Sequence, residues 1–474
     1  MKYDIIVLGA GSAGLNVAVF MNRIGLKVLM VEKHVVGGDC LNYGCVPSKA
    51  LISLAKEVHA AKNAEKLGVK LAGKVNLKVV ADTIKKRQDV IREHESPEYF
   101  RKKGIAVEMG SPRFTGKNSI EVNGKEFSAK KIVIATGSRP FTPPIEGVDD
   151  VDYFTNETIF KNTDLPKNFL VVGGGPIGIE IAHAYTRLGA GVTVVERNTH
   201  VLPKEDQEMG HMVCEVLKQD GAKLMIGYNP VRFEGKNTLI VSKFDPETRK
   251  NVGSEVKIQF DKVLIAIGRR LNIEGLALEK AGVKVEDKKI VVDKYLRTTN
   301  KRVFVCGDVA GDFMFTHWAE YQASIVINNM LNVFKKSTDR KRVAWVTYTD
   351  PELASFGMQE SVLKEEGVKY RVIEQEIGDV DRAIAEGYTK GKLKLFISKG
   401  NIVGGTMLAK NAGELMGELV QAMTLKIPAS KIFERIFPYP TMSRVNKKVI
   451  AKMLGEKLTT RAMGFLRLFF RLKR

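Results

Sequence analysis

DIIVLGAGSAG, at residues 4–14, is the stretch that decides the fold of this chain. An apolar strand passes directly into a turn with three spaced glycines, and a helical pattern follows to about Ile24. A second apolar strand covers residues 28–31 and ends at Glu32. This order predicts a strand-turn-helix-strand unit of the kind that binds dinucleotides.

The same pattern occurs again in FLVVGGGPIG, at residues 169–178. A helix to about Leu188, a strand over 192–195 and Glu196 complete the second copy. In both copies the acid follows the first glycine by 23 residues, the length of one such unit. One glycine turn alone would be a weak signal, but two copies in register are not explained by ordinary tight turns. We therefore predict two dinucleotide-binding domains.

The glycines of such a turn have separate tasks. The first allows the sharp bend, the second lets the backbone approach a pyrophosphate, and the third lets the helix pack on the strand. The helix N-terminus then stabilises the phosphate charge, and the acid at the strand end accepts hydrogen bonds from a ribose. The residues assigned to these tasks are Gly9, Gly11, Gly14 and Glu32 in the first unit and Gly173, Gly175, Gly178 and Glu196 in the second.

The second acid also bears on the choice of cofactor. A carboxylate at Glu196 pairs with a free ribose 2′-hydroxyl and repels a 2′-phosphate, so we expect NADH to be preferred over NADPH. Two neighbouring residues, Arg197 and His200, could still support some NADPH binding.

Further strands follow the two units. Apolar runs that end in a glycine turn cover residues 132–137 and 263–268, and a third, at 303–308, precedes a predicted helix from Thr316 through Met330. Beyond a polar, basic linker, hairpin-like strands over 392–397 and 402–407 and the helices that accompany them predict a separate α+β domain.

The most specific feature is GGDCLNYGCVPSK, at residues 37–49. Cys40 and Cys45, five residues apart at the start of a helix, can be bridged if the first turn is distorted, and a helix N-terminus lowers a thiol pKa. The alternatives are two unconnected thiols or half of a metal site. No second Cys/His cluster follows at ligand spacing, so we expect no metal. Cys214 and Cys306 stand alone and are predicted core residues.

Composition excludes several classes of protein. The chain has 474 residues, of which 44% are hydrophobic and 27% charged, which argues against a disordered, collagen-like or polytopic membrane protein. Four cysteines suit a reducing cytosol. The uncharged run over 5–22 contains the glycine turn, so we expect a cytoplasmic protein that is not exported. The net charge of +21 suggests an anionic partner.

Taken together, these motifs resemble a known family. The cysteine segment, the two glycine turns, ATGSRP at 135–140 and CGD at 306–308 closely resemble the flavoprotein disulfide reductases with two dinucleotide-binding domains. That family includes dihydrolipoamide dehydrogenase, glutathione reductase and mercuric reductase. The resemblance extends to about residue 455.

The resemblance implies FAD on the first unit, a nicotinamide on the second, and a redox-active Cys40–Cys45 disulfide beside the flavin. It implies that Cys45 faces the flavin ring, Cys40 exchanges with substrate, and Lys49 pairs with Glu180 near the reactive flavin nitrogen. Asp308 would hold the ribityl chain, and the helix opening at Thr316 would point its positive end at the pyrimidine side. Further cofactor residues implied in the same way are Gly38, Thr136, Gly137 and His317 for FAD and Gly268 for NAD.

The expected fold class is α/β, with two Rossmann-like domains plus a C-terminal α+β dimerisation domain in a homodimer. The expected segments are the first part of the FAD-binding domain, the NAD-binding domain, the second part of the FAD-binding domain, the dimerisation domain and a basic amphipathic tail, at residues 1–150, 151–270, 271–340, 341–455 and 456–474.

The chain departs from the family pattern at FPYPTMSR, residues 437–444. The dithiol enzymes carry a His-Pro-Thr-x-Ser-Glu motif there, whereas Tyr439 stands at the histidine position and Arg444 at the glutamate. None of the seven histidines lies beyond His317. A tyrosine, with a pKa near ~10, is a poor base at neutral pH. The tyrosine resembles that of mercuric reductase, but the vicinal C-terminal cysteines that deliver mercury there are absent. Arg444 either favours an anionic substrate or is a solvated interface charge.

The C-terminal tail concentrates positive charge. Residues 441–474 hold ten basic residues against one acid, Glu456. Such a helix is too short to span a bilayer but suits an interfacial helix on anionic lipid. A helix docked on the dimer partner and a frayed tail are the alternatives. On a helical wheel one face carries Phe465, Leu468, Phe469 and Leu472, and another carries Arg467, Arg471 and Arg474.

The predicted function is NADH-dependent reduction, with electrons passing from NADH to FAD, to the Cys40–Cys45 disulfide and to an unidentified acceptor. The alternatives are a dihydrolipoyl dehydrogenase, a membrane-associated reductase of quinones or metal ions at the inner face of the cell membrane, and a regulatory flavoprotein without activity. Nucleic acid is not an expected partner, because the basic residues of the tail alternate with large apolar ones.

Overall fold

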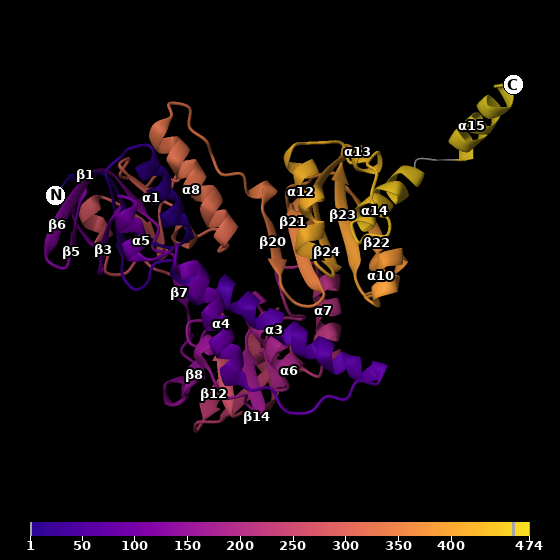
Figure 1. The fold of residues 1–474 in the computed structure, drawn as a ribbon, viewed down its shortest axis with the longest axis horizontal. Helices are drawn as coiled ribbons and strands as arrows, with labels where there is room; N and C mark the ends of the chain where they lie inside the picture. The colour runs from indigo at the N-terminus through magenta and orange to yellow at the C-terminus, as the bar shows by residue number, and fades with distance from the viewer. Residues whose placement is uncertain (1, 457–459, 474) are drawn as a thin grey trace. The chain divides into compact units, whose positions relative to one another are not determined.

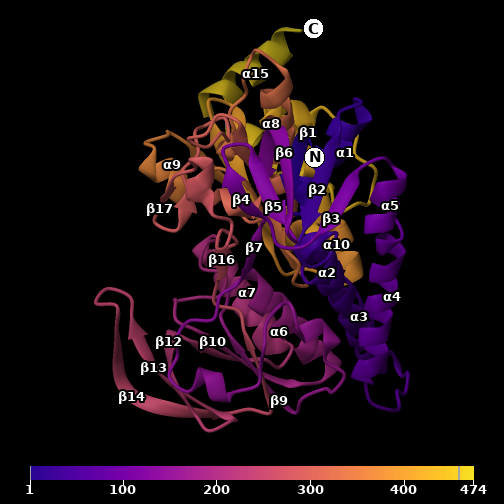
Figure 2. The same ribbon diagram turned by 90° about the vertical axis from the view of Figure 1, so that its left-hand side faces the viewer.

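The computed structural model describes residues 2–456 and 460–473, with side chains from Met463 onward in the second segment. The chain forms two compact units. The first comprises Met1–Thr199 and Asp220–Thr338, and the second comprises His200–Gln219 and Asp339–Arg474. Figures 1 and 2 show the ribbon from two directions.

The first sheet of the first unit is built around β1, whose apolar residues are buried on both faces. Leu8 pairs with Val31 of β2 on one side and with Ile134 of β6 on the other, all in parallel. The carboxyl ends of the three strands therefore coincide, which sets the first glycine turn directly beside Glu32. In sheet order the strands are β3 (Ala106–Met109), β2 (Val28–Glu32), β1 (Lys2–Leu8), β6 (Lys125–Ile134), β5 (Ser119–Val122) and β4 (Arg113–Gly116), with β19 (Val303–Val305) paired to β6.

Two helices pack against each other beside this sheet, α1 (Ser12–Arg23) and α8 (Thr316–Leu331) (Figure 1). Helix α8 begins at Thr316, as the sequence predicts, and α1 begins at Ser12, two residues before the third glycine of the predicted turn. Cys306, at the end of β19, is fully buried, as predicted for a core residue. The other helices of this part are α2 (Gly38–Asn42), α3 (Cys45–Asn63), α4 (Leu77–Arg92) and α5 (Pro97–Lys102).

The second sheet repeats the first. β9 (Asn168–Val172) is flanked in parallel by β10 (Gly191–Glu196) and β15 (Lys262–Ile265), and α6 (Pro176–Leu188) follows its glycine turn. The predicted duplication is therefore confirmed. The remaining strands are β8 (Tyr153–Phe154) and β11 (Lys223–Ile226) at the sheet edges, the antiparallel sheet of β12 (Tyr228–Glu234), β13 (Thr238–Asp245) and β14 (Lys250–Gln259), and the pairs β7 (Ser138–Pro140) with β16 (Arg269–Leu271) and β17 (Val285–Glu286) with β18 (Lys289–Ile290).

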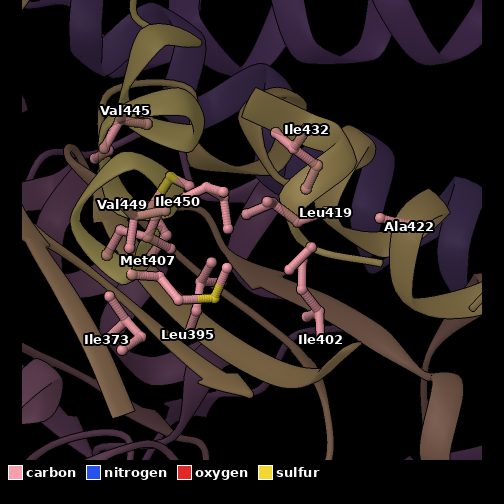
Figure 3. Close-up of a cluster of buried hydrophobic side chains, with 14 of the residues drawn as sticks. Ile373, Leu395, Ile402, Met407, Leu419, Ala422, Ile432, Val445, Val449 and Ile450 are labelled. Carbon is pink, nitrogen blue, oxygen red and sulfur yellow. The ribbon is translucent and has the colours of Figure 1, made fainter. Parts of the chain in front are cut away.

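The second unit contains a five-stranded antiparallel sheet covered by helices, which is the α+β domain that the sequence predicts. Figure 3 shows its core, where Leu419 and Val449 point from helices toward Leu395 and Met407 on the strands. The strands, in sheet order, are β20 (Ala344–Thr347), β21 (Glu352–Gly357), β24 (Asn401–Ala409), β23 (Lys392–Ser398) and β22 (Arg371–Glu376). The helices are α9 (Glu360–Glu365), α10 (Asp381–Glu386), α11 (Ala412–Leu415), α12 (Gly417–Thr424), α13 (Ser430–Phe433), α14 (Arg444–Gly455) and α15 (Thr460–Leu472).

Helix α7 (Gln207–Gln219) also belongs to the second unit, although it lies far earlier in the sequence. Two lysines of β23 hold it. Lys394 Nζ lies 3.1 Å from Asp206 Oδ1 and 2.6 Å from Glu208 Oε2, and Lys392 Nζ lies 2.6 Å from Glu208 Oε1. Cys214, on the same helix, is buried, as predicted.

The tail forms α15, whose described large side chains are exposed. Arg474, which the predicted arginine face includes, lies outside the described residues. Within the part of the chain that the structure describes, no helix has the length and apolar character needed to cross a membrane.

Candidate active site at the paired cysteines

The two cysteines lie on different helices. Cys40 is in α2, and Cys45 is the first residue of α3. The chain breaks the helix at Gly44, where a Cβ atom would lie 3.0 Å from Asp39 Oδ2 and 3.1 Å from its carbonyl oxygen. This break is the distortion that a bridge between the two cysteines requires.

A close approach of two glycines sets this segment against the first glycine turn. Gly38 has φ +58°, and a Cβ atom there would lie only 2.7 Å from Gly11 Cα. Any larger residue would push the cysteine segment away from the turn. The close contact with Gly11 therefore requires a glycine at position 38.

The two thiols have opposite electrostatic surroundings. The hydrogen bond from Cys40, a second one with Thr316 and the Lys49 ammonium together lower the pKa of Cys45 to about 6, against the opposing effect of burial. The Cys45 sulfur lies 3.3 Å from Thr316 Oγ1. The hydrogen bond with Cys45, followed by burial, raises the pKa of Cys40. In the dithiol state these surroundings favour the thiolate on Cys45, at the N-terminus of α3, where the helix dipole also favours it.

Lys49 and Glu180 form the ion pair that the resemblance implies. Lys49 Nζ lies 2.7 Å from Glu180 Oε2, and the glutamate side chain is 6% exposed. Lys49 comes from α3 and Glu180 from α6, so the pair joins the cysteine helix to the second glycine-turn helix. The Lys49 ammonium compensates the charge of the buried Glu180 carboxylate.

The two glycine turns have matching geometry. A Cβ atom at Gly9, with φ +106°, would lie 2.3 Å from the Ala135 carbonyl oxygen, and one at Gly173, with φ +115°, would lie 2.5 Å from that of Ala266. The first glycine of each turn is thus required by the neighbouring strand. At Gly175 a Cβ atom would meet nothing within 4 Å, so this side of the turn is open to a ligand, as its assigned task demands.

The strand-end acids hold the turns in place. Glu32 accepts hydrogen bonds from Ala10 N and His34 N, both at 2.8 Å. In the second turn, Glu196 accepts from Gly174 N at 2.7 Å and from Asn198 N at 2.8 Å. Each carboxylate therefore lies against the backbone of its glycine turn.

The two residues that could support NADPH have other partners. The Arg197 guanidinium lies 5.9 Å from the centre of the Phe244 ring. His200 is buried, and its Nδ1 lies 2.8 Å from the Val201 carbonyl oxygen.

A polar network around Asp308 was only partly predicted. Ser138 Oγ donates to Asp308 Oδ2 at 2.5 Å, and Arg269 Nε donates to Ser138 Oγ at 2.7 Å. Burial raises the pKa of Asp308, against the hydrogen bond from Ser138 and the charge of Arg269. Sequence reasoning missed Ser138 and Arg269 as members of the site. Both follow predicted glycines by one residue, Gly137 and Gly268, and that repeated position is the signal that could have found them.

Two further predicted residues lie near this network. Thr136 Oγ1 donates to the Asn272 carbonyl oxygen at 2.6 Å, and His317 stacks on Phe315 with ring centres 5.3 Å apart. The structure therefore brings Cys40, Cys45, Lys49, Glu180, Thr136, Asp308, Thr316 and His317 into one unit, together with both glycine turns.

Tyr439 belongs to the other unit. Its side chain is 67% exposed, and the Arg444 guanidinium lies 5.3 Å from its ring centre. The two residues that replace the family's His-Glu pair thus contact each other at the start of α14. Within the described residues, no group of three His, Cys, Asp or Glu side chains is arranged to hold a metal ion.

Comparison with known proteins gives concordant matches. A family model described as pyridine nucleotide-disulphide oxidoreductase matches residues 3–323, and one for the dimerisation domain of the same proteins matches residues 343–450. A mercuric reductase of Staphylococcus aureus is 31% identical over 447 residues, covering 93% of this chain and 80% of the relative. A dihydrolipoyl dehydrogenase of Thermus scotoductus is 34% identical over 449 residues, covering 93% and 95%.

Solved structures agree with these matches. The HOCl-induced flavoprotein disulfide reductase RclA from Escherichia coli superimposes with a TM-score of 0.83 at 26% identity. The superposition covers 95% of this chain and 99% of that one.

Proposed function

Because the chain belongs to the pyridine nucleotide-disulphide oxidoreductases, we propose that it passes electrons from NADH through FAD to the Cys40–Cys45 pair and on to a small acceptor. The predicted resemblance, the α/β fold with its dimerisation domain, and the enzyme class are confirmed. The use of FAD and a pyridine nucleotide and the homodimer follow from the family. The observation that carries the proposal is the position of the cysteine pair: Cys45 begins α3 with its sulfur 3.3 Å from Thr316 Oγ1, and Gly38 packs against Gly11 of the first glycine turn.

Both glycine turns fit dinucleotides, because their first glycines are locked by neighbouring backbone and Gly175 is open. When bound, FAD accepts a hydride from the nicotinamide and can pass two electrons to an adjacent disulfide. The residues proposed to hold FAD are Gly9, Gly11, Gly14, Glu32, Gly38, Thr136, Gly137, Asp308, Thr316 and His317, and those proposed for NAD are Gly173, Gly175, Gly178, Glu196 and Gly268.

The two thiols have different roles in the proposed reaction. Two electrons and two protons convert the disulfide to two thiols, and the proton of Cys45 leaves because its pKa is about 6. Cys40 keeps its proton until it attacks the acceptor, since its pKa is raised. In the attack of Cys40 on an acceptor disulfide, the Cys40 proton would pass to the first acceptor sulfur as it leaves as a thiol. The Cys45 thiolate would then displace the second acceptor sulfur, which takes up the proton that Cys45 had lost, and the Cys40–Cys45 bond would be restored.

The acceptor is proposed to be one that needs no imidazole base. Cys40 must lose its proton to react, yet Tyr439 and Arg444 stand where the family has histidine and glutamate. This argues against fast turnover of lipoamide. Dihydrolipoyl dehydrogenase is the second candidate, because relatives of that name are up to 34% identical over nearly the whole chain.

A panel of acceptors tests the proposal. NADH oxidation by the holoenzyme is measured with lipoamide, glutathione disulfide, quinones and metal ions, for the natural protein and for Cys40→Ser. We expect the natural protein to reduce lipoamide slowly and another acceptor of the panel faster. Cys40→Ser should lose the reduction of that preferred acceptor. Activity that survives Cys40→Ser would favour a direct flavin-to-quinone reductase, and fast lipoamide turnover would favour the dehydrogenase.

We also propose a preference for NADH. Glu196 stands at the ribose position, while Arg197 and His200 are engaged by Phe244 and by backbone. The test compares kcat/KM for NADH with kcat/KM for NADPH. Glu196→Ser should lower the ratio of the NADH value to the NADPH value. A natural enzyme that prefers NADPH would contradict it.

The tail is proposed to contact anionic lipid at the inner face of the cell membrane, in an otherwise cytoplasmic protein. On α15, Phe465 is 69% and Phe470 81% exposed, and Arg467 and Arg471 lie on the narrow polar side. Such a helix suits the interface of a negatively charged bilayer. Flotation of the holoenzyme with anionic vesicles, compared with Phe465→Ser/Phe469→Ser, tests this. Unchanged flotation would refute the contact, and a change in oligomeric state would indicate docking on the dimer partner.

A further inference from the structure

A second group of exposed apolar side chains lies in the first unit, far from the tail in sequence. Residues 332–336, NVFKK, follow α8, and we name them the 332–336 loop (Figure 1, after α8). Val333 is 88% and Phe334 89% exposed, more than any other large apolar side chain described except Ile436. A large apolar pair this exposed calls for a partner.

The loop is held in this conformation by its own hydrogen bonds. Asn328 Nδ2 donates to the Phe334 carbonyl oxygen at 3.3 Å. Asn329, which is buried, donates to the Lys336 carbonyl oxygen at 2.8 Å and accepts from Lys336 N at 2.7 Å. Val333 and Phe334 therefore project from an anchored turn.

Cations surround the loop. The Lys335 ammonium donates to the Asn329 carbonyl oxygen at 2.8 Å. Burial lowers the pKa of Lys131, and the positive charges of Arg302, Lys335 and Arg297 lower it further. Lys131 also donates to the Lys301 carbonyl oxygen.

One carboxylate partly offsets this charge. Asp293 lies 2.9 Å from Arg297 and 3.8 Å from Lys301. Asn329 ties the loop to the same segment, since its Nδ2 donates to the Tyr295 carbonyl oxygen at 3.1 Å. The surroundings of the loop keep a clear positive excess.

We propose that the 332–336 loop is a lipid contact of this protein, in which Val333 and Phe334 enter the headgroup boundary of an anionic bilayer while the surrounding cations bind its phosphates. The proposal extends the membrane contact proposed for α15 but uses residues of the other unit. A single weak anchor gives only reversible attachment, and stable attachment takes two signals. The loop would supply one such signal of its own.

The chemistry favours lipid over two other partners. A nucleic-acid strand would use the cations and Phe334, by base stacking, but it leaves the aliphatic Val333 without an apolar partner. A second copy of the chain would set the same positive cluster against itself in a two-fold contact, which is repulsive. An anionic bilayer is complementary to both the charge and the apolar tip.

Vesicle flotation of the full-length holoenzyme tests the loop. Vesicles of phosphatidylcholine, with and without phosphatidylglycerol, are mixed with the natural protein, Val333→Ser/Phe334→Ser, Phe465→Ser/Phe469→Ser and the combined variant. The control is Val79→Ser/Val90→Ser, since these side chains are 58% and 65% exposed on α4 of the same unit. We expect the loop variant to lose about tenfold or more in partitioning to phosphatidylglycerol vesicles, the control to lose nothing, and salt to weaken binding.

The outcomes separate the loop from the tail. If the loop variant binds like the control while the tail variant does not, the loop proposal is overturned and the tail contact stands. If only the loop variant loses binding, the loop stands and the tail contact fails. A loop variant that changes the oligomeric state instead would overturn the lipid assignment. Phe334→Trp provides a second measurement, because its emission should shift to the blue with anionic vesicles, and an unchanged spectrum would overturn insertion.

Discussion

Replacing Cys40 by alanine should raise the pKa of Cys45. The hydrogen bond from Cys40 is the largest single cause that holds the Cys45 pKa at about 6. A hydrogen bond to a charged group contributes about 1.5–3 kcal/mol, and one pKa unit corresponds to about 1.4 kcal/mol. Without the donor, the Cys45 pKa should therefore rise by about one to two units, to about 7 to 8.

The change is large at neutral pH. With the pKa at about 6, the thiolate prevails above that value and is lost as pH falls through it, so about 90% of Cys45 is charged at pH 7. In Cys40→Ala that fraction should fall to between about 10% and 50%. Cys40→Ser is the matched control, because its hydroxyl keeps a donor at the same position. Thr316 and Lys49 continue to lower the pKa in both variants.

The assay is the rate of alkylation by iodoacetamide against pH, which follows the thiolate fraction. Cys214 and Cys306 are buried and contribute little background. The alanine variant should titrate at least about one unit higher than the serine variant. Equal midpoints in the two variants would refute the assignment of the low pKa to the Cys40 hydrogen bond.

Three further predictions concern the same machinery. Cys45→Ser should abolish the long-wavelength thiolate-to-flavin absorbance that anaerobic NADH produces in the natural enzyme, and a retained band would show that the other sulfur faces the flavin. Lys49→Met removes the ammonium that lies 2.7 Å from the buried Glu180 carboxylate and should lower the free energy of unfolding in urea by about 3 kcal/mol, and Lys49→Met/Glu180→Gln should recover part of that loss. Tyr439→His/Arg444→Glu should raise lipoamide turnover about tenfold or more, since an imidazole with a pKa near ~6.5 can take the thiol proton; no gain would mean that the missing base does not limit turnover.

The sequence predicted turns and helix starts well where residues a few positions apart determine them. The turn at Gly9 needs a positive φ, and α1 begins immediately after it, so residues a few positions apart determine both. The second copy at Gly173 follows the same rule. The sequence also predicted the start of α8 at Thr316. The pairing of Lys49 with Glu180 came instead from the resemblance to a family.

The sequence did not predict contacts between residues that lie far apart along the chain. Ser138 contacts Asp308 over 170 residues and Arg269 over 131, and the glycines that precede Ser138 and Arg269 mark these positions without indicating that the two side chains meet. The membership of α7 in the second unit depends on Lys394, which lies 188 residues from Asp206. Such pairs depend on how sheets and helices assemble.

The sequence by itself determined two dinucleotide-binding units, a cysteine pair at a helix start and a basic, apolar tail, because glycine turns, hydrophobic period and charge are properties of neighbouring residues. Only the tertiary structure decided which sulfur holds the charge. Cys40 and Cys45 are chemically identical, and their pKa values diverge because folding places Cys45 at the start of α3, where it accepts a hydrogen bond from Cys40 and has the Lys49 ammonium nearby. Electrostatic environment is a property of positions in space, which the order of residues alone does not provide.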